Sequence, residues 1–337
     1  MAELSFNFEA LSRSETAWLL NQEAKVIQAL LPVYERALDG IYARLVAEPN
    51  PYKAARLQAI QAQLEDILDR FEKQAVSAAE SVFKPIAQGA ASRAVKTRNE
   101  LLASRPNLKP SHAQGITELP AIIPQAAVRH LATMTGLDFG VLKVEIKRSV
   151  YAELSQSVLL GESTAKQVAR LKTVVPMSET GQTTRKGYRA RLETIARTNT
   201  AAARSAGTQE AHEALNKKQP GSVRYQMIIE SIRKTPDTTN HYFSFAVHGV
   251  VRRFGEPFKV SAAEVEAARF ELQTLKGWKK MAGGGIFWPV LDGYYQGASL
   301  PAHYNDRGTM IPWAPDYQLP GITPKHPQII AIMGKTA

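Results

Sequence analysis

The stretch LQAIQAQLEDILDRFEKQAVSAAESV, residues 57–82, decides the fold class. Its apolar side chains return at intervals of three or four residues, at Leu57, Ile60, Leu64, Ile67, Phe71, Ala75, Ala78 and Val82. Because about 3.6 residues make one turn of an α-helix, this interval gathers them on one face. The stretch therefore predicts an amphipathic helix that buries one face against other helices.

A second helical pattern precedes this stretch and runs from Trp18 to Leu45. Pro32 predicts a kink within it, and Pro49-Asn50-Pro51 ends it, because two prolines interrupt helical hydrogen bonding. Two such helices joined by a short turn predict an antiparallel hairpin. Pro85 predicts a break before helical sequence continues to Ser104.

The middle of the chain predicts a linker followed by more helices. Residues 105–124 contain repeated prolines and little periodicity, which is typical of a linker or an extended strap. Helical sequence resumes around Gln125 and again over residues 139–159. Residues 186–215 predict a long helix that is rich in Ala and Arg and free of proline.

The last third changes character after Ser222. Residues 224–230 and 248–254 predict short strands, and residues 261–275 predict a helix. From Gly277 onward the sequence is rich in Gly, Pro and aromatic residues, which predicts an extended tail with little regular structure.

The predicted fold class is mainly α, with an N-terminal helical hairpin or bundle, a small α+β C-terminal domain and an extended tail. The predicted parts are an N-terminal helical domain (1–104), a linker (105–124), a basic helical domain (125–222), a small α+β domain (223–310) and the tail (311–337).

Composition excludes several classes of protein. The 337 residues hold 42 Lys+Arg against 31 Asp+Glu, a net charge of +11, and no cysteine. Zero cysteines exclude disulfides, Cys-ligated zinc and thiol nucleophiles. The sequence has neither a membrane-spanning apolar run nor a secretory leader, so we expect no membrane contact and a cytoplasmic setting.

The positive charge is concentrated between Ala165 and Arg204, where the sequence has nine basic residues and only two acidic ones. Four arginines lie near one face of the predicted helix, at Arg185, Arg189, Arg197 and Arg204. They are candidate contacts for nucleic-acid phosphates or for an acidic partner, and a merely solvated helix face is an equal alternative. Arg252 and Arg253 predict a solvated edge.

Two polar clusters in the last third are candidates for a site. One runs from Asp237 to His241 and on to Gly249; the other runs from Pro301 to Gly308. A metal site could draw on two of the three histidines and on the two aspartates of these clusters, at Asp237, His241, His303 and Asp306. Turn capping and loop hydrogen bonds are the favoured interpretation. The chain has no phosphate loop and no serine elbow, so we expect no enzyme, cofactor, metal or small-molecule substrate.

Three blocks resemble the phage head morphogenesis family, the minor head proteins of Mu-like and related tailed phages. Arg191-Leu192-Glu193-Thr194-Ile195-Ala196-Arg197-Thr198-Asn199, with Ala203 and Gly207, is similar to that family's Ile-Ala-Arg-Thr-Glu helix. Asp237 and Gly249 keep the interval of its Asp-x-x-Thr stretch, and residues 301–308 align with its Pro-x-His-Pro-Asn-Cys-Arg-Cys block. The blocks occur in the family's order over roughly residues 160–310.

The departures from this pattern concern the family's cysteines. His241, Ser244, Asp306 and Gly308 stand where many relatives place cysteines, so the family's four-ligand metal site is not expected here. The resemblance instead implies a hydrogen-bonded structural motif that joins the last block to the Asp237 turn. Its members are Asp237, His241, Gly249, His303, Asn305, Asp306 and Arg307.

The resemblance implies a virion structural protein, a low-copy minor capsid protein located in the head and assembled in the host cytoplasm. Implied partners are the portal protein and capsid or scaffold proteins, with non-specific double-stranded DNA as an open further contact. Two alternatives remain: a metal-dependent nuclease built on the two clusters, and a nucleic-acid-binding protein unrelated to phage.

Overall fold

A computed structural model describes most of the chain. It covers residues 8–47, 54–103, 125–160, 166, 169, 188–218, 220–229, 242–274, 286, 288–298, 300 and 308–313. Four long helices and two short ones account for most of these residues, and six short strands follow the last long helix. The described chain is therefore mainly α with a small C-terminal α+β region, as the sequence predicted.

The helices and strands have the following bounds. The helices are α1 (Phe8–Ala47), α2 (Ala54–Ala103), α4 (Gln125–Leu159), α6 (Tyr188–Lys218), α7 (Tyr242–Val247) and α8 (Ala262–Thr274). The strands are β1 (Tyr225–Ile229), β2 (Val251–Arg253), β3 (Phe258–Ser261), β4 (Val290–Leu291), β5 (Tyr294–Gly297) and β6 (Thr309–Trp313).

The chain forms two compact units, each made of segments that are distant in sequence. The first unit contains residues 1–22, 84–127 and 200–337, and the second contains residues 23–83 and 128–199. Helices α1, α2, α4 and α6 each contribute residues to both units. The units therefore do not follow the predicted domain boundaries, and the boundary predicted at residue 310 divides strand β6.

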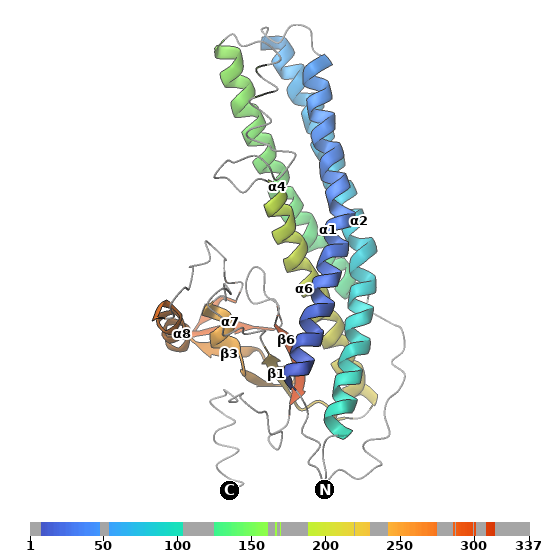
Figure 1. Ribbon diagram of the computed structural model, residues 1–337, viewed down its shortest axis with the longest axis vertical. Coiled ribbons are helices and arrows are strands. Elements are labelled where there is room, and N and C mark those ends of the chain that lie inside the picture. Colours follow the sequence, from blue (N-terminus) through green and yellow to red (C-terminus); the bar gives the residue numbers. More distant parts are fainter. Residues whose placement is uncertain are drawn as a thin grey trace. The chain divides into compact units, whose positions relative to one another are not determined.

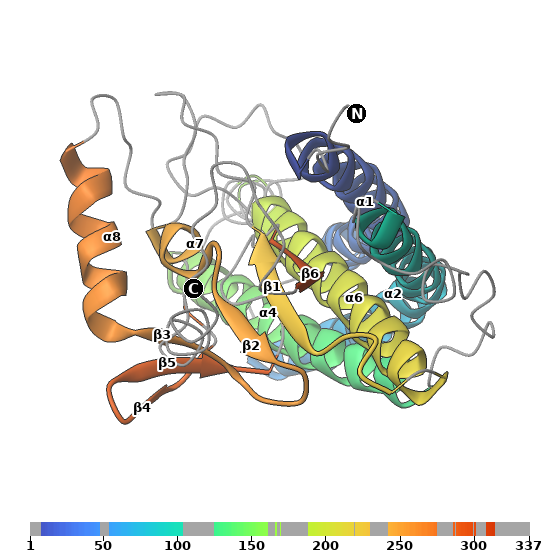
Figure 2. The ribbon, with the colours of Figure 1, turned by 90° about the horizontal axis from the view of Figure 1, so that it is seen from below.

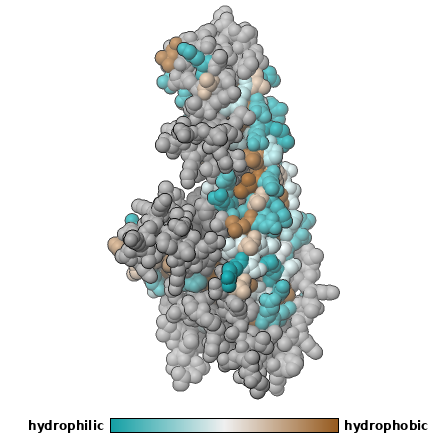
Figure 3. Space-filling view, viewed as in Figure 1, coloured by the Kyte–Doolittle hydropathy of each residue, from teal (hydrophilic) through white to brown (hydrophobic). Residues whose placement is uncertain are grey.

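The second unit is a helical assembly with an aromatic centre. Tyr34 of α1, Phe71 of α2 and Phe139 of α4 meet edge to face, with ring centroids 6.2 and 5.9 Å apart. All three rings are at most 2% exposed, so they bury the apolar stripes that the sequence predicted. The face in Figure 3 carries hydrophilic side chains along the helices, with a few apolar ones between them.

Ion pairs join α2 to α4 at the surface of this second unit. Lys143 Nζ lies 2.6 Å from Asp69 and 2.8 Å from Glu72, and Lys147 pairs with Glu65. The acids occur in the opposite chain order to the lysines, which fits antiparallel helices. The Lys143 ammonium lowers the pKa of Asp69 through a hydrogen bond and its charge.

The first unit contains two three-stranded antiparallel sheets (Figures 1 and 2). Their strand orders are β2-β1-β6 and β3-β5-β4. In the first sheet Tyr225 is paired with both Arg253 and Trp313, so β1 is the central strand. Helices α7 and α8 pack beside the strands around a core that includes Ile228, Phe243 and Phe258, each fully buried.

Helix α6 approaches α2 very closely within the first unit. A Cβ atom built on Gly207 would lie 2.0 Å from the carbonyl oxygen of Ala87. Only glycine allows this backbone contact, because any side chain would overlap the neighbouring helix. Beyond the contact, Ala211 and Leu215 of α6 pack with Val95 of α2.

Pro85 does not break α2, so that prediction is wrong. The helix runs through Pro85, as α1 runs through Pro32. A proline inside a helix costs about 3 kcal/mol or more. Phe83 and Ile86 beside it are each 1% exposed. Burying each of these side chains stabilises by roughly 1.5–3 kcal/mol, so the two together offset the cost.

The prediction of little regular structure after residue 277 is wrong over residues 290–297 and 309–313. Strands β4 and β5 form a hairpin whose turn residues, Asp292 and Gly293, both have positive φ. Strand β6 pairs with β1 along its whole length despite Pro312. Because β6 lies at an edge of its sheet, one side of its backbone needs no partner strand and tolerates proline.

The predicted linker, residues 105–124, lies outside the described residues.

Candidate functional site

One residue of the predicted structural motif is described, and it holds a turn. Gly249 has φ +79°, and its N–H donates to the carbonyl of Ile228 at 2.9 Å. Glycine adopts this backbone conformation without strain, so Gly249 lets the chain leave α7 and enter β2 beside β1. The other predicted members lie outside the described residues: Asp237, His241, His303, Asn305, Asp306 and Arg307.

The predicted arginine face on α6 is corrected at its C-terminal end. Arg204 is 2% exposed, so it does not present a charge to solvent. The close contact at Gly207 places this part of α6 against α2, which explains the burial. Arg197 is partly exposed and pairs with Glu193 at 3.2 Å. Arg185 and the side chain of Arg189 lie outside the described residues.

A buried polar cluster joins α6 to the first sheet. Gln209 and His212 of α6 meet Gln226 of β1 and Arg252 of β2. His212 and Gln226 are fully buried and Arg252 is 3% exposed. Buried polar groups need partners, so these four residues fix the position of α6 on the strands.

Arg252 is the centre of this cluster. Its Nε donates to Gln226 Oε1 at 2.8 Å, and one terminal nitrogen donates to Gln209 Oε1 at 3.1 Å. The other terminal nitrogen donates to the carbonyls of Glu256 and Ala298, at 2.7 and 2.6 Å. One guanidinium thus holds α6, β1, the turn after β2 and the residue after β5.

Every partner of Arg252 in these four hydrogen bonds is an uncharged oxygen of an amide or a backbone carbonyl. Its guanidinium also lies over the ring of Phe258, 4.1 Å from the centroid, where the face of the ring attracts a cation. Burial lowers the pKa of Arg252 to about 10, so the side chain still carries its charge at neutral pH.

His212 is neutral, and its tautomer follows from Arg252. An arginine N–H can only donate, so the Gln226 atom facing Arg252 is its oxygen and the amide nitrogen faces His212. That nitrogen donates to His212 Nδ1 at 2.7 Å, which places the imidazole proton on Nε2. Burial, with a smaller effect of the Arg252 charge, lowers the pKa of His212 to about 3.

The chemistry available in this cluster is structural. Two amides, a neutral imidazole and a hydrogen-bonded guanidinium offer no nucleophile and no general base near neutral pH. Within the described ranges, no three His, Asp or Glu side chains gather closely enough to hold a metal ion.

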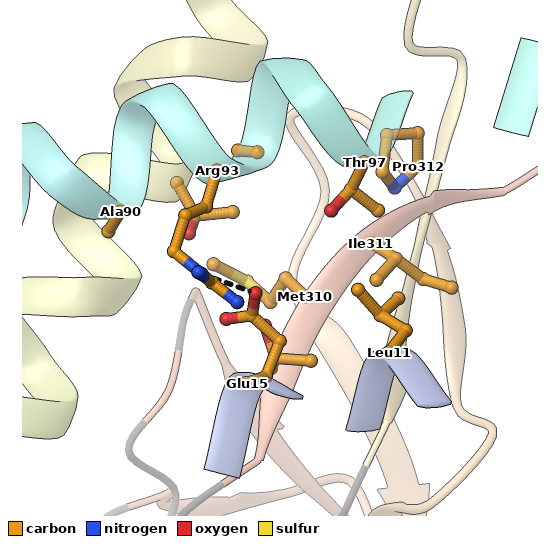
Figure 4. Close-up of a pocket in the computed structure, with 11 residues that line it drawn as sticks. Leu11, Glu15, Ala90, Arg93, Thr97, Met310, Ile311 and Pro312 are labelled. Carbon is orange, nitrogen blue, oxygen red and sulfur yellow. Dashed lines mark hydrogen bonds and ion pairs between the residues drawn. The ribbon is translucent and has the colours of Figure 1, made fainter. Parts of the chain in front are cut away.

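A small pocket lies where α1, α2 and β6 meet in the first unit (Figure 4). Arg93 donates to Glu15 at 2.7 Å and to Ser14 at 2.9 Å across it. Its cavity volume is about 10 Å³. That is room for about one water molecule, so the pocket does not fit a substrate.

Sequence reasoning missed the buried cluster for an identifiable reason. Arg252 and Arg253 were both expected at a solvated edge, but Arg252 is buried while Arg253 is exposed. Successive residues of a strand point to opposite faces, so two adjacent arginines on a covered strand cannot both face solvent. That alternation was the available signal.

No family model matches the chain, and comparisons with curated proteins and with solved structures gave no match. Across the part of the chain that the structure describes, no helix combines the length and apolarity needed to cross a membrane.

Proposed function

We propose that this chain is a virion structural protein, a low-copy minor capsid protein of the phage head. It would join the head shell or portal during assembly in the host cytoplasm. Its partners would be the portal protein and capsid or scaffold proteins. The proposal begins with the three sequence blocks and their order, and the residues within them give it structural support.

The observation that carries the proposal is that three glycines, one from each block, lie in one compact unit, while residues 191–199 of the first block belong to the other unit. Gly207 of the first block allows the backbones of α6 and α2 to come into contact, and Gly249 of the second block lies beside β1. Gly308 of the third block is buried and leads directly into β6, which pairs with β1. A structural role within one unit for a residue of each block supports the resemblance.

A structural role is also supported by the way the polar groups are used. The strongest hydrogen-bond donor of the described sheets, Arg252, connects four segments of the fold. The small pocket beside Glu15 and Arg93 has no room for a substrate. A protein that withstands assembly forces benefits from such cross-links, because a hydrogen bond to a charged group contributes about 1.5–3 kcal/mol.

The experiment that tests the proposal is head assembly with the phage that encodes the chain. Particles purified from infected cells should contain the protein at a few copies per head, measured by quantitative mass spectrometry. Deleting its gene should reduce infectious heads, and the wild-type gene supplied in trans should restore them. A Gly207→Leu variant should fail to restore them, because its side chain would overlap the Ala87 backbone.

Two results would contradict the proposal. Absence of the protein from purified heads and from assembly intermediates would exclude a head role. Metal-dependent nicking of a plasmid by the purified chain, lost in His303→Ala, would favour the nuclease alternative.

A further inference from the structure

Strand β6 carries main-chain groups that its own sheet does not pair. Ile228 of β1 donates to the carbonyl of Val250 at 3.0 Å and accepts from the N–H of Gly249 at 2.9 Å, so both of its main-chain groups face β2. Met310 of β6 lies opposite Ile228. Because hydrogen-bonded and non-hydrogen-bonded pairs alternate along an antiparallel ladder, the N–H and the C=O of Met310 point away from β1. Of the described strands, none lies on that side of β6.

Helices cover this outer edge of β6. Met310 is only 3% exposed, so bulk water does not solvate its main-chain groups. The small pocket of Figure 4, which we call the edge cavity, lies against residues 309–312 and is closed by α1, α2 and Thr208 of α6. Buried N–H and C=O groups in folded proteins are paired with other protein groups or with ordered water. The edge cavity is the place where such a partner of Met310 fits.

Polar side chains complete the wall of the edge cavity. Glu15, Thr97 and Thr208 line it and are 8%, 7% and 5% exposed. Thr97 turns its hydroxyl toward the cavity (Figure 4). Arg93 Nε donates to Glu15 Oε1 at 2.7 Å, so the two charges offset each other and Glu15 Oε2 can accept a further hydrogen. A wall of this composition suits a small neutral molecule that both donates and accepts hydrogen bonds.

The size of the edge cavity selects the ligand. Its volume is about 10 Å³, which is room for about one water molecule and for nothing larger. A buried water molecule typically makes about three hydrogen bonds to polar groups that lack other partners. The main chain of Met310, the Glu15 carboxylate and the two threonine hydroxyls supply that number.

We propose that the edge cavity is a binding site for one structural water molecule. The water accepts a hydrogen bond from the Met310 N–H and donates one to the Glu15 carboxylate, and the hydroxyls of Thr97 and Thr208 complete its surroundings. It thereby joins the open edge of β6 to α1 and α2. The inference goes beyond the proposed head function and does not rest on it.

A crystal structure of the chain tests the site directly. At a resolution that shows ordered waters, one peak of density should lie in the edge cavity, about 2.7–3.2 Å from the Met310 nitrogen. In solution, the Met310 amide of the deuterated, ¹⁵N-labelled chain should show a nuclear Overhauser cross-peak to water, with the sign that marks a long-lived bound water.

Two substitutions at one position assign the cross-peak to the cavity. Thr97→Ile adds a methylene group that fills the space, so the cross-peak should disappear. Thr97→Val removes the hydroxyl at nearly the same volume, and the cross-peak should remain because Met310 and Glu15 still hold the water. Thr16→Val changes a threonine of α1 outside the cavity and should leave the cross-peak unchanged. Unchanged positions of the other amide signals show that each variant is folded.

Three outcomes would overturn the inference. The crystal structure could show no density in the edge cavity, or the wild-type Met310 amide could show no cross-peak to water. The cross-peak could persist in Thr97→Ile, which would place its source outside the cavity. It could also disappear in Thr97→Val, which would make the exchanging hydroxyl proton its source. None of these outcomes decides whether the chain enters phage heads, so the two proposals fail independently.

Discussion

At the scale of single residues, Gly207 allows the closest helix contact described in the structure. A methyl group there would lie 2.0 Å from the Ala87 carbonyl oxygen and would also meet its carbon at 2.8 Å. These are backbone atoms, which cannot move aside as the end of a side chain can. Gly207→Ala should therefore lower the free energy of unfolding by roughly 1–3 kcal/mol, measured by urea denaturation.

The matched control for Gly207 is another helical glycine. At Gly136 a Cβ would make ordinary contact with Val76 at 3.6 Å. Gly136→Ala should be neutral or stabilise by up to about 1 kcal/mol, because alanine favours the helix. Equal effects at the two positions would contradict the close contact between α6 and α2.

His212 predicts a pH dependence of stability with a definite sign. Its pKa is about 3 in the folded chain, below its usual value of 6.5, so the unfolded chain binds a proton more readily. The stability contribution of the neutral histidine is complete above about pH 6.5 and is lost as the pH falls from there toward 3.

The measurement compares wild type with His212→Gln between pH 7 and pH 4. Over this window the wild type should lose up to about 1.4 kcal/mol more per pH unit than the variant. Other titrating groups contribute to both proteins and cancel in the difference. Parallel pH profiles would mean that His212 is protonated, or reached by solvent, in the folded chain.

At the scale of elements, β6 makes the C-terminal region part of the core. Ile311 is 2% exposed and packs with Met227 and Val251 of the neighbouring strands. Ile311→Asp buries an unpaired carboxylate and should lower stability by several kcal/mol, seen as a large fall in melting temperature. Val290→Asp on β4, where the side chain is 51% exposed, should change stability by less than about 0.5 kcal/mol. A chain in which both substitutions are tolerated would lack the β1–β6 pairing.

Periodicity was enough to predict the helices, and burial explains why. Leu64, Phe71 and Ala75 repeat on one face of α2 because that face is covered, so the spacing of apolar residues in the sequence follows the buried contacts. Strand β6 gave no such pattern. It is buried on four successive residues, and Pro312 is a residue that normally argues against a strand.

Local patterns could indicate only one member of the buried cluster, since adjacent Arg252 and Arg253 must face opposite sides of their strand. Gln209, Gln226 and Arg252 belong to three elements, and each alone resembles an ordinary surface residue. Their burial follows from the pairing of β1 with β2 and the placement of α6. Neither is visible in a window of neighbouring residues.

At the scale of the whole molecule, the two units share four continuous helices. Helices α1, α2, α4 and α6 each have residues in both units without interruption. When the part of a shared helix in one unit melts, the part in the other unit loses the turn to which it was hydrogen-bonded. We therefore expect both units to unfold together.

Tryptophan makes this expectation measurable, because all four tryptophans belong to the first unit. Tryptophan fluorescence should therefore report the first unit, and far-ultraviolet circular dichroism should report the helices of both. In urea the two transitions should coincide, in wild type and in Phe71→Ala, whose cavity lies in the second unit. Separate midpoints would show that the units unfold independently.

The pairing of β1 with β6 also governs the order of events during synthesis. Strand β1 leaves the ribosome long before its partner, and until Trp313 is made one edge of β1 stays open. An open strand edge is a template for pairing with another chain, and nascent chains on one messenger RNA are close neighbours. A brief translational delay after β2 would lengthen that exposure. A chaperone that covers β1 until the last strand arrives would shorten it, so the yield of folded chain should depend on chaperone supply more than on the stability of the finished protein.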